Sequence, residues 1–327
     1  MPAYWSSSVV AALWQVLLHS ALAATVFLLW ARRWRMPPGA ARRRMLTVIL
    51  VLPLLTALVP GRGGVEFREG WAWLDSSRLL AIPLGAVRGT EIHVYHGVLA
   101  VAGVTVLAAL AQELLPTLRR WCDGRDLEQA PEDLARFARE LPGWERCRVK
   151  VCRDPGLHVE TSGRPGKPRL VLSRDVVALP AAERALVLRH EHAHWTAGRW
   201  WRTHLLFVVR LVQIYNPVAL WAFREYGVET EIACDAEAVV GKSGTGGSGT
   251  SKTGEGERDR ARTLARTLLR FYEDAAGVAT RWTLRRRVDV LLERPAIAGQ
   301  RPEDDELSPE TVWIAAAVLL VTLPWFV

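Results

Sequence analysis

The chain has 327 residues, of which 50% are hydrophobic, and a formal net charge of +8 at pH 7. The apolar residues concentrate in long uncharged runs near both ends, whereas the charged residues concentrate in the middle. This distribution excludes an ordinary soluble domain and favours a membrane protein. Because the arginines cluster beside apolar runs, the basic balance indicates membrane topology, and we expect no direct binding of nucleic acid.

Three apolar runs predict a membrane region over residues 1–118. The first, Val9–Trp30, has no charge and can cross a hydrocarbon core of roughly 30 Å. No Lys or Arg precedes it and it exceeds a signal-peptide core in length, so we expect it to remain uncleaved. The runs Leu46–Val59 and Val94–Leu118 follow. We place the transmembrane helices at about 9–30, 44–60 and 94–118.

The distribution of arginine predicts the orientation of these helices. The loop Ala31–Arg44 contains six arginines and no acidic residue, which indicates the cytoplasmic side. The loop Gly61–His93 balances four arginines with four acidic residues and suits the outer side. The N-terminus is then outside and residues 119–310 are cytosolic. The apolar run 311–327 predicts a fourth transmembrane helix.

Residues 119–310 are expected to form an α+β domain inserted between the third and fourth transmembrane helices. Residues 146–152 alternate as a strand does, residues 169–172 are a short apolar strand, and residues 163–168 have the composition of a turn. Residues 241–258, rich in Gly, Ser and Thr, predict a flexible loop.

The cysteines show no C-x-x-C spacing, which argues against a structural zinc site or a redox motif. We interpret them as reduced thiols in a cytosolic setting, and a bridge between Cys147 and Cys152 is the alternative. The four are Cys122, Cys147, Cys152 and Cys234.

A helix expected to begin near Pro180 carries the pentapeptide His-Glu-His-Ala-His at positions 190–194. His190 and His194 are four residues apart, so their imidazoles share one helix face and can bind one ion. Glu191 can reach a metal-bound water without occupying the metal, which suits a general base. The pattern H-E-x-x-H therefore predicts a zinc-dependent peptidase.

A third ligand candidate is Glu231, which lies one helical turn before Asp235. Glu231 would complete a His₂Glu site with a fourth position open to water, and Asp235 could accept a hydrogen bond from a ligand imidazole. The alternative for these acids is a solvated helix face. His192 points away from the ligand face and is interpreted as non-ligating. Trp195, Trp200 and Trp201 could form a substrate pocket, but beside an apolar run they are interpreted as membrane-interface anchors.

The motifs resemble the BlaR/MecR-type membrane zinc metallopeptidases, the sensor and signal-transducer peptidases of beta-lactam resistance. The residues that carry the resemblance are Leu188–His194, Tyr215-Asn216-Pro217 with Trp221, Glu231–Asp235, and Leu284–Val288 followed by Leu291-Leu292.

The resemblance implies a gluzincin-like zincin domain, a Zn²⁺ cofactor and a bacterial cytoplasmic membrane location. It assigns ligand roles to His190, His194 and Glu231, the base to Glu191, and supporting roles to Asp235 and Asn216. It also implies regulated cleavage of a protein substrate, such as a cytosolic transcriptional repressor, or of the chain itself.

Two features depart from the family pattern. An acidic residue often follows the second histidine in the family, where this chain has Gly198-Arg199, and we expect no penicillin-binding sensor domain because the chain ends at Val327. The alternatives are a housekeeping membrane protease of the prenyl-processing or heat-shock type, and a non-catalytic membrane receptor that holds zinc for structure.

Overall fold

The contacts of the computed structural model divide the chain into two compact units. Unit 1 comprises residues 1–120, 203–227 and 306–327, and unit 2 comprises residues 121–202 and 228–305. Residues 203–227 thus group with the N-terminal helices, although they lie inside the sequence range 119–310. The structure describes residues 2–33, 36, 38–58, 82–87, 90–111, 127–153, 156, 158–164, 167–195, 199–240, 253–274 and 278–293.

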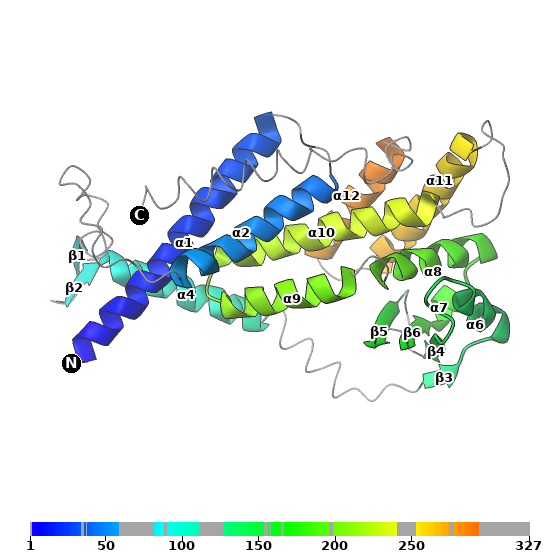
Figure 1. Ribbon diagram of the computed structural model, residues 1–327, viewed down its shortest axis with the longest axis horizontal. Helices are drawn as coiled ribbons and strands as arrows, with labels where there is room; N and C mark the ends of the chain where they lie inside the picture. Colours follow the sequence, from blue (N-terminus) through cyan, green and yellow to red (C-terminus); the bar gives the residue numbers. More distant parts are fainter. Residues whose placement is uncertain are drawn as a thin grey trace. The chain divides into compact units, whose positions relative to one another are not determined.

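Unit 1 consists mainly of apolar helices (Figure 1). They are accompanied by a small antiparallel hairpin in the loop that we predicted to be outside, which the sequence analysis did not anticipate. The elements in chain order are α1 (Pro2–Arg33), α2 (Ala40–Leu58), β1 (Pro83–Val87), β2 (Thr90–His93), α4 (Val94–Ala109), most of α9 (Arg199–Val212) and the first part of α10 (Pro217–Val240).

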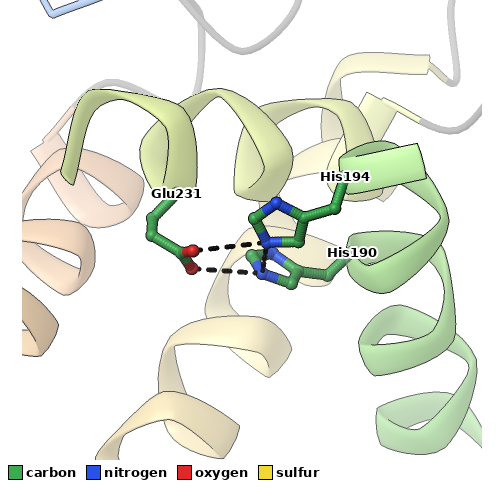
Figure 2. A group of neighbouring side chains, drawn as sticks. All are labelled: His190, His194 and Glu231. Atoms are coloured by element: carbon green, nitrogen blue, oxygen red, sulfur yellow. Dashed lines mark hydrogen bonds and ion pairs between the residues drawn. The ribbon is translucent and has the colours of Figure 1, made fainter. Parts of the chain in front are cut away.

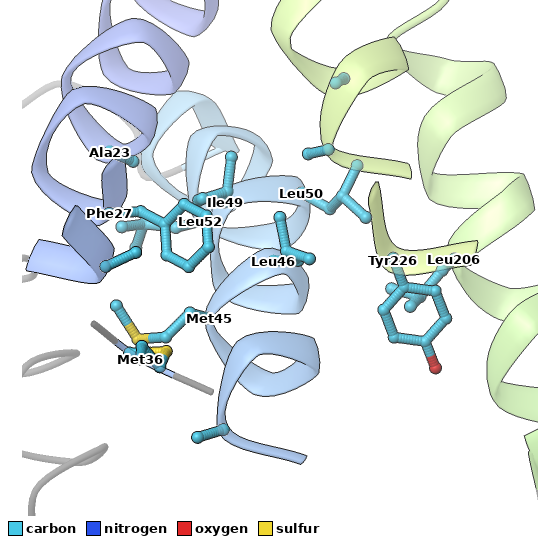
Figure 3. Packing of buried hydrophobic residues seen from close by; sticks show 14 residues of the cluster. Ala23, Phe27, Met36, Met45, Leu46, Ile49, Leu50, Leu52, Leu206 and Tyr226 are labelled. Carbon is cyan, nitrogen blue, oxygen red and sulfur yellow. The ribbon is translucent and has the colours of Figure 1, made fainter. Parts of the chain in front are cut away.

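The core of unit 1 is a cluster of buried aliphatic, aromatic and methionine side chains from α1, α2, α9 and α10 (Figure 3). Ile49 and Leu50 of α2 lie at its centre and are at most 1% exposed. Leu206 and Tyr226 belong to the same cluster, which is why residues 203–227 group with the N-terminal helices. Close van der Waals packing of these side chains holds the helices together.

The mainly helical prediction is confirmed, but its membrane topology is only partly tested. Among the described residues, one helix is long and apolar enough to cross a membrane, Val16–Arg33 within α1. The apolar helix Val94–Ala109 is shorter. Residues 112–118 of the third predicted span and the fourth predicted span, 311–327, lie outside the described residues. The predicted four-span arrangement therefore stays a prediction.

Asn216 has a clear structural role in unit 1. Its Oδ1 accepts hydrogen bonds from the N–H groups of Val218 and Ala219 and so caps the first turn of α10. Its Nδ2 donates to Ser20 Oγ at 2.7 Å, and the neighbouring Gln213 donates to the carbonyl of Leu50. Satisfied polar contacts of this kind connect α10 and the turn before it to α1 and α2.

Unit 2 begins with a four-stranded sheet in the order β3-β4-β6-β5. The strands are β3 (Leu127–Gln129), β4 (Arg148–Cys152), β5 (Val159–Arg164) and β6 (Lys167–Ser173). β4 and β6 pair in parallel, and the other neighbours are antiparallel. The two strands predicted from the sequence are thus present as β4 and β6.

The predicted turn at residues 163–168 is tighter than expected, because β5 continues to Arg164 and β6 begins at Lys167. Gly163 adopts a φ of +114°, and a Cβ at this position would lie 2.7 Å from the carbonyl oxygen of Lys167. Only glycine fits this close approach without strain. The hairpin leaves β5 at one edge of the sheet.

The helices of unit 2 form two hydrophobic clusters, one with the sheet and one among themselves. Leu170 and Leu172 of β6 pack with Val187 and Leu188 of α8. Leu186 of α8 packs instead with residues of α10, α11 and α12. The helix α8 therefore lies between the two clusters. The helices are α6 (Glu132–Arg139), α7 (Arg174–Val177), α8 (Ala181–Trp195), the end of α10, α11 (Thr253–Asp274) and α12 (Val278–Glu293).

Two smaller expectations need comment. Residues 253–258, predicted to belong to the flexible loop, form the start of α11, and residues 241–252 lie outside the described residues. Cys147, Cys152 and Cys234 are buried and form no disulfide with one another, which agrees with their interpretation as reduced thiols. Burial raises the pKa of the Cys147 thiol to about 11.

Candidate metal centre

The three predicted ligand side chains lie together in unit 2 (Figure 2). His190 and His194 extend from one face of α8, and Glu231 extends toward them from α10. The Nε2 atoms of the two histidines are 3.2 Å apart, and each is 3.3 Å from one oxygen of Glu231. Three potential ligand atoms from two helices thus converge on one point.

The other ring nitrogens of both histidines have partners on α10. His190 Nδ1 is 2.8 Å from Asp235 Oδ1, and His194 Nδ1 is 3.5 Å from Cys234 Sγ. If each Nδ1 carries the hydrogen, each Nε2 keeps a lone pair that faces Glu231. Metal-binding histidines commonly donate their second N–H in this way, which fixes the tautomer and the ring orientation.

A buried arginine completes the charge balance of the cluster. Arg287 of α12 is 8% exposed, and its Nε and Nη2 donate to the two oxygens of Asp235 at 2.7 Å each. Its Nη1 is 3.0 Å from Glu231 Oε2. The neighbouring Arg286 pairs with a different buried acid, Glu229, at 2.5 Å. Local sequence patterns predicted no role for these arginines, which belong to the segment Leu284–Val288 that resembles the family.

The cluster strongly favours cationic groups. Burial lowers the pKa of His190, but Asp235 and Glu231 outweigh this effect and raise it to about 10. Burial also opposes ionisation of Glu231, yet Arg287 and the two histidines hold its pKa well below the usual range. Both ionised acids therefore attract positive charge to the point where the ligand atoms meet.

Glu191 lies beside the cluster, and a residue of the sheet binds its carboxylate. The hydroxyl of Thr161, on the edge strand β5, donates to Glu191 Oε2 at 2.6 Å. This bond orients the carboxylate while leaving the other oxygen available for other partners. Sequence reasoning did not identify Thr161, which is 30 residues away in the chain.

A pocket of about 410 Å³ opens beside these side chains. Its lining combines polar groups with aliphatic side chains from β5, α8, α11 and α12. The lining residues are His158, Val159, Val187, His190, Glu191, His194, Glu231, Leu264, Thr267, Leu268, Leu284 and Arg287. A pocket with an apolar wall and a few converging polar groups is typical of a ligand or substrate site.

Other residues singled out from the sequence lie elsewhere. His192 Nε2 is 2.8 Å from the carbonyl of Pro142, which agrees with its predicted non-ligating role. Trp195 is partly buried and packs against the sheet cluster, and its role as a membrane-interface anchor stays a prediction. Trp201 is 52% exposed, and the side chain of Trp200 is not among those that the structure describes. The described partners of Asn216 belong to unit 1, so its predicted role beside the ligands gains no support from them.

The geometry can hold a metal ion. Ligand atoms bound to one tetrahedral zinc ion at about 2.0–2.1 Å stand about 3.3 Å apart. The two Nε2 atoms are 3.2 Å apart, and each lies 3.3 Å from a different oxygen of Glu231, so every one of these pairs has the spacing of two ligands of one zinc ion. Two imidazole nitrogens and a carboxylate oxygen are also ligands that zinc accepts readily.

Comparison with known proteins agrees with this chemistry. The family described as BlaR1 peptidase M56 matches residues 163–245, a segment that contains His190, Glu191, His194 and Glu231. No curated protein matches the chain. The resemblance inferred from the motifs is therefore confirmed for this segment, which is similar to the BlaR1 peptidase M56 family.

Proposed function

We propose that the chain is a membrane-embedded, zinc-dependent endopeptidase whose ligands are His190, His194 and Glu231. The observation that carries this proposal is the convergence of the three ligand atoms beside Glu191 in an open pocket. The match to the BlaR1-type peptidase family supports the reaction class. A His₂Glu set with one open position is typical of catalytic rather than structural zinc.

The reaction can be assigned to residues of the chain. His190, His194 and Glu231 would hold a zinc ion, which would supply Lewis-acid polarisation and a lowered pKa of bound water. Glu191 accepts a proton from the attacking water and returns it to the leaving amine. Asp235 and Cys234 hold the imidazoles at Nδ1, and Thr161 holds Glu191. The aliphatic side chains of the pocket give a substrate apolar surface beside the reacting groups.

The edge strand β5 is the proposed binding site for the substrate backbone. β5 ends the sheet order and contains Thr161, which contacts Glu191. An extended segment can add to such an edge through backbone hydrogen bonds. A segment bound in this way would have a peptide bond close to Glu191. The resemblance suggests a cytosolic protein such as a transcriptional repressor, or the chain itself, as the substrate.

Membrane embedding is supported by unit 1. Its helices expose aliphatic side chains that water would not favour, including Leu29 of α1 at 65% and Leu107 of α4 at 68%. α9 exposes Leu205 and Val208 at 53% and 55% in the same way. We propose lipid contact for these faces and several spans, with the metal centre on the cytosolic side as the arginine distribution predicts.

The test of this function is metal removal from the purified full-length chain. We expect the wild-type protein to contain about one zinc ion per chain and to cleave an unstructured protein such as casein, because the proposed site holds one catalytic ion. A chelator should abolish cleavage, and added Zn²⁺ should restore it.

Bound zinc without cleavage of casein or of any candidate partner would contradict the peptidase and favour a zinc-containing receptor. Cleavage that survives complete zinc removal would contradict the metal mechanism.

A smaller effect is expected at Thr161. Thr161→Val removes the hydroxyl that orients Glu191 and should lower kcat by about 10-fold, since one hydrogen bond contributes about 0.5–1.5 kcal/mol and more when one partner is charged. KM should change little, and Thr161→Ser should retain most of the activity. Steady-state kinetics on one peptide would measure both. Equal losses in the Ser and Val variants would argue against the hydroxyl.

A further inference from the structure

We infer that Arg287 is a positioning residue of the metal centre, which holds the zinc ligand Glu231 and the His190 partner Asp235 in place through one guanidinium group. The inference rests on the proposed function, because it concerns the same ligand set. It assigns a role to α12, a helix that contributes no ligand.

Arg287 contacts two acidic side chains of α10, and both of these lie next to His190 of α8. Its Nε and Nη2 bind Asp235, whose Oδ1 lies 2.8 Å from His190 Nδ1. Its Nη1 lies 3.0 Å from Glu231 Oε2, and the same oxygen lies 3.3 Å from His190 Nε2. The guanidinium therefore contacts the ligand Glu231 on α10 directly. It reaches the ligand His190 on α8 through Asp235.

The shape of the guanidinium suits this task. Its planar fork can bind one carboxylate through two parallel N–H bonds while a third N–H reaches a second carboxylate. Glu231 and Asp235 are one turn apart on α10, so their charges repel each other, and a cation between them offsets that repulsion. A lysine ammonium supplies the charge but not the fork.

Burial distinguishes this pair from a surface ion pair. Asp235 is 1% exposed and Arg287 is 8% exposed. Removing one member of such a pair leaves an uncompensated buried charge, which is strongly unfavourable. The side chain of Asp235 would then reorganise, and the ring of His190 would lose the partner that orients it.

The neighbouring pair offers a matched control. Arg286 is also on α12 and binds Glu229, which is 1% exposed, on α10. Arg286 Nη2 donates to Glu229 Oε1, and neither residue is one of the three proposed ligands. A purely structural role for the ion pairs between α10 and α12 predicts similar consequences for both arginines, whereas a positioning role predicts different consequences for the metal.

The experiment compares Arg287→Met, Arg287→Lys and Arg286→Met in the full-length protein. Zinc affinity is measured by competition with a chromophoric chelator, and folding is monitored by circular dichroism and thermal unfolding. We expect Arg287→Met to weaken zinc binding by about 10–100-fold, the usual effect of losing an outer partner of a ligand. The zinc affinity of Arg287→Lys should lie between those of Arg287→Met and the wild-type protein. The zinc affinity of Arg286→Met should stay within about threefold of the wild-type value. Its melting temperature should nevertheless fall, because a buried ion pair is lost.

Substitution of Co²⁺ gives a second readout that does not depend on activity. The visible absorption of bound Co²⁺ reports ligand geometry, so it should change in Arg287→Lys and stay unchanged in Arg286→Met. Equal zinc affinities in Arg287→Lys and wild type, with identical Co²⁺ spectra, would overturn the inference even if Arg287→Met fails to fold. Equal loss of zinc in both methionine variants would also overturn it. A wild-type protein that binds no zinc would refute the proposed function itself.

Discussion

Glu191→Gln is expected to abolish cleavage while the metal stays bound. The amide keeps the size of the carboxylate and can still accept the hydrogen bond from Thr161, but it cannot take a proton from water. General acid–base groups contribute about 10²–10⁴-fold to rates, and Glu191 serves in both proton transfers, so we expect kcat to fall by at least about 10³-fold. Cleavage kinetics and zinc analysis of the same preparation would measure the two effects.

Glu183→Gln is the matched control, because Glu183 lies on the same helix but pairs with Arg270. We expect it to retain most of the activity. A Glu191→Gln protein that cleaves at the wild-type rate would refute the proposed base. The inactive variant should also retain bound substrate, so crosslinking in cells could identify the protein that it captures.

Glu231→Gln should remove the metal rather than the proton transfer. The neutral amide is a weaker ligand than a carboxylate, and the change also takes an anion away from Arg287. Zinc affinity should fall by more than the decrease of about 10–100-fold that follows the loss of an outer partner of a ligand. Competition with a chelator would measure it, and high Zn²⁺ concentrations should restore part of the activity.

The control for this variant is Glu229→Gln on the same helix. Glu229 is 1% exposed and pairs with Arg286, so its substitution also breaks a buried ion pair. We expect Glu229→Gln to lower thermal stability but to bind zinc with near wild-type affinity. Equal zinc affinity in Glu231→Gln and wild type would show that Glu231 is not a ligand.

Local sequence patterns predicted a large part of the fold. Long apolar runs predicted helices where α1 and α2 lie, and alternation predicted β4. They did not predict the hairpin β1–β2, or the strand β5, whose sequence VETSGR has one aliphatic residue, Val159. The grouping of residues 203–227 with the N-terminal helices was also missed, since it depends on which distant surface Leu206 and Tyr226 pack against.

Helical spacing by itself determined which potential ligands share a helix face: His190 with His194 on α8, and Glu231 with Asp235 on α10. Only the tertiary structure decided what surrounds them. Thr161 reaches Glu191 across 30 residues, and Arg287 reaches Asp235 across 52. The physical reason is that backbone periodicity sets neighbours within a helix, whereas partners so far apart in the chain are chosen by the packing of whole elements.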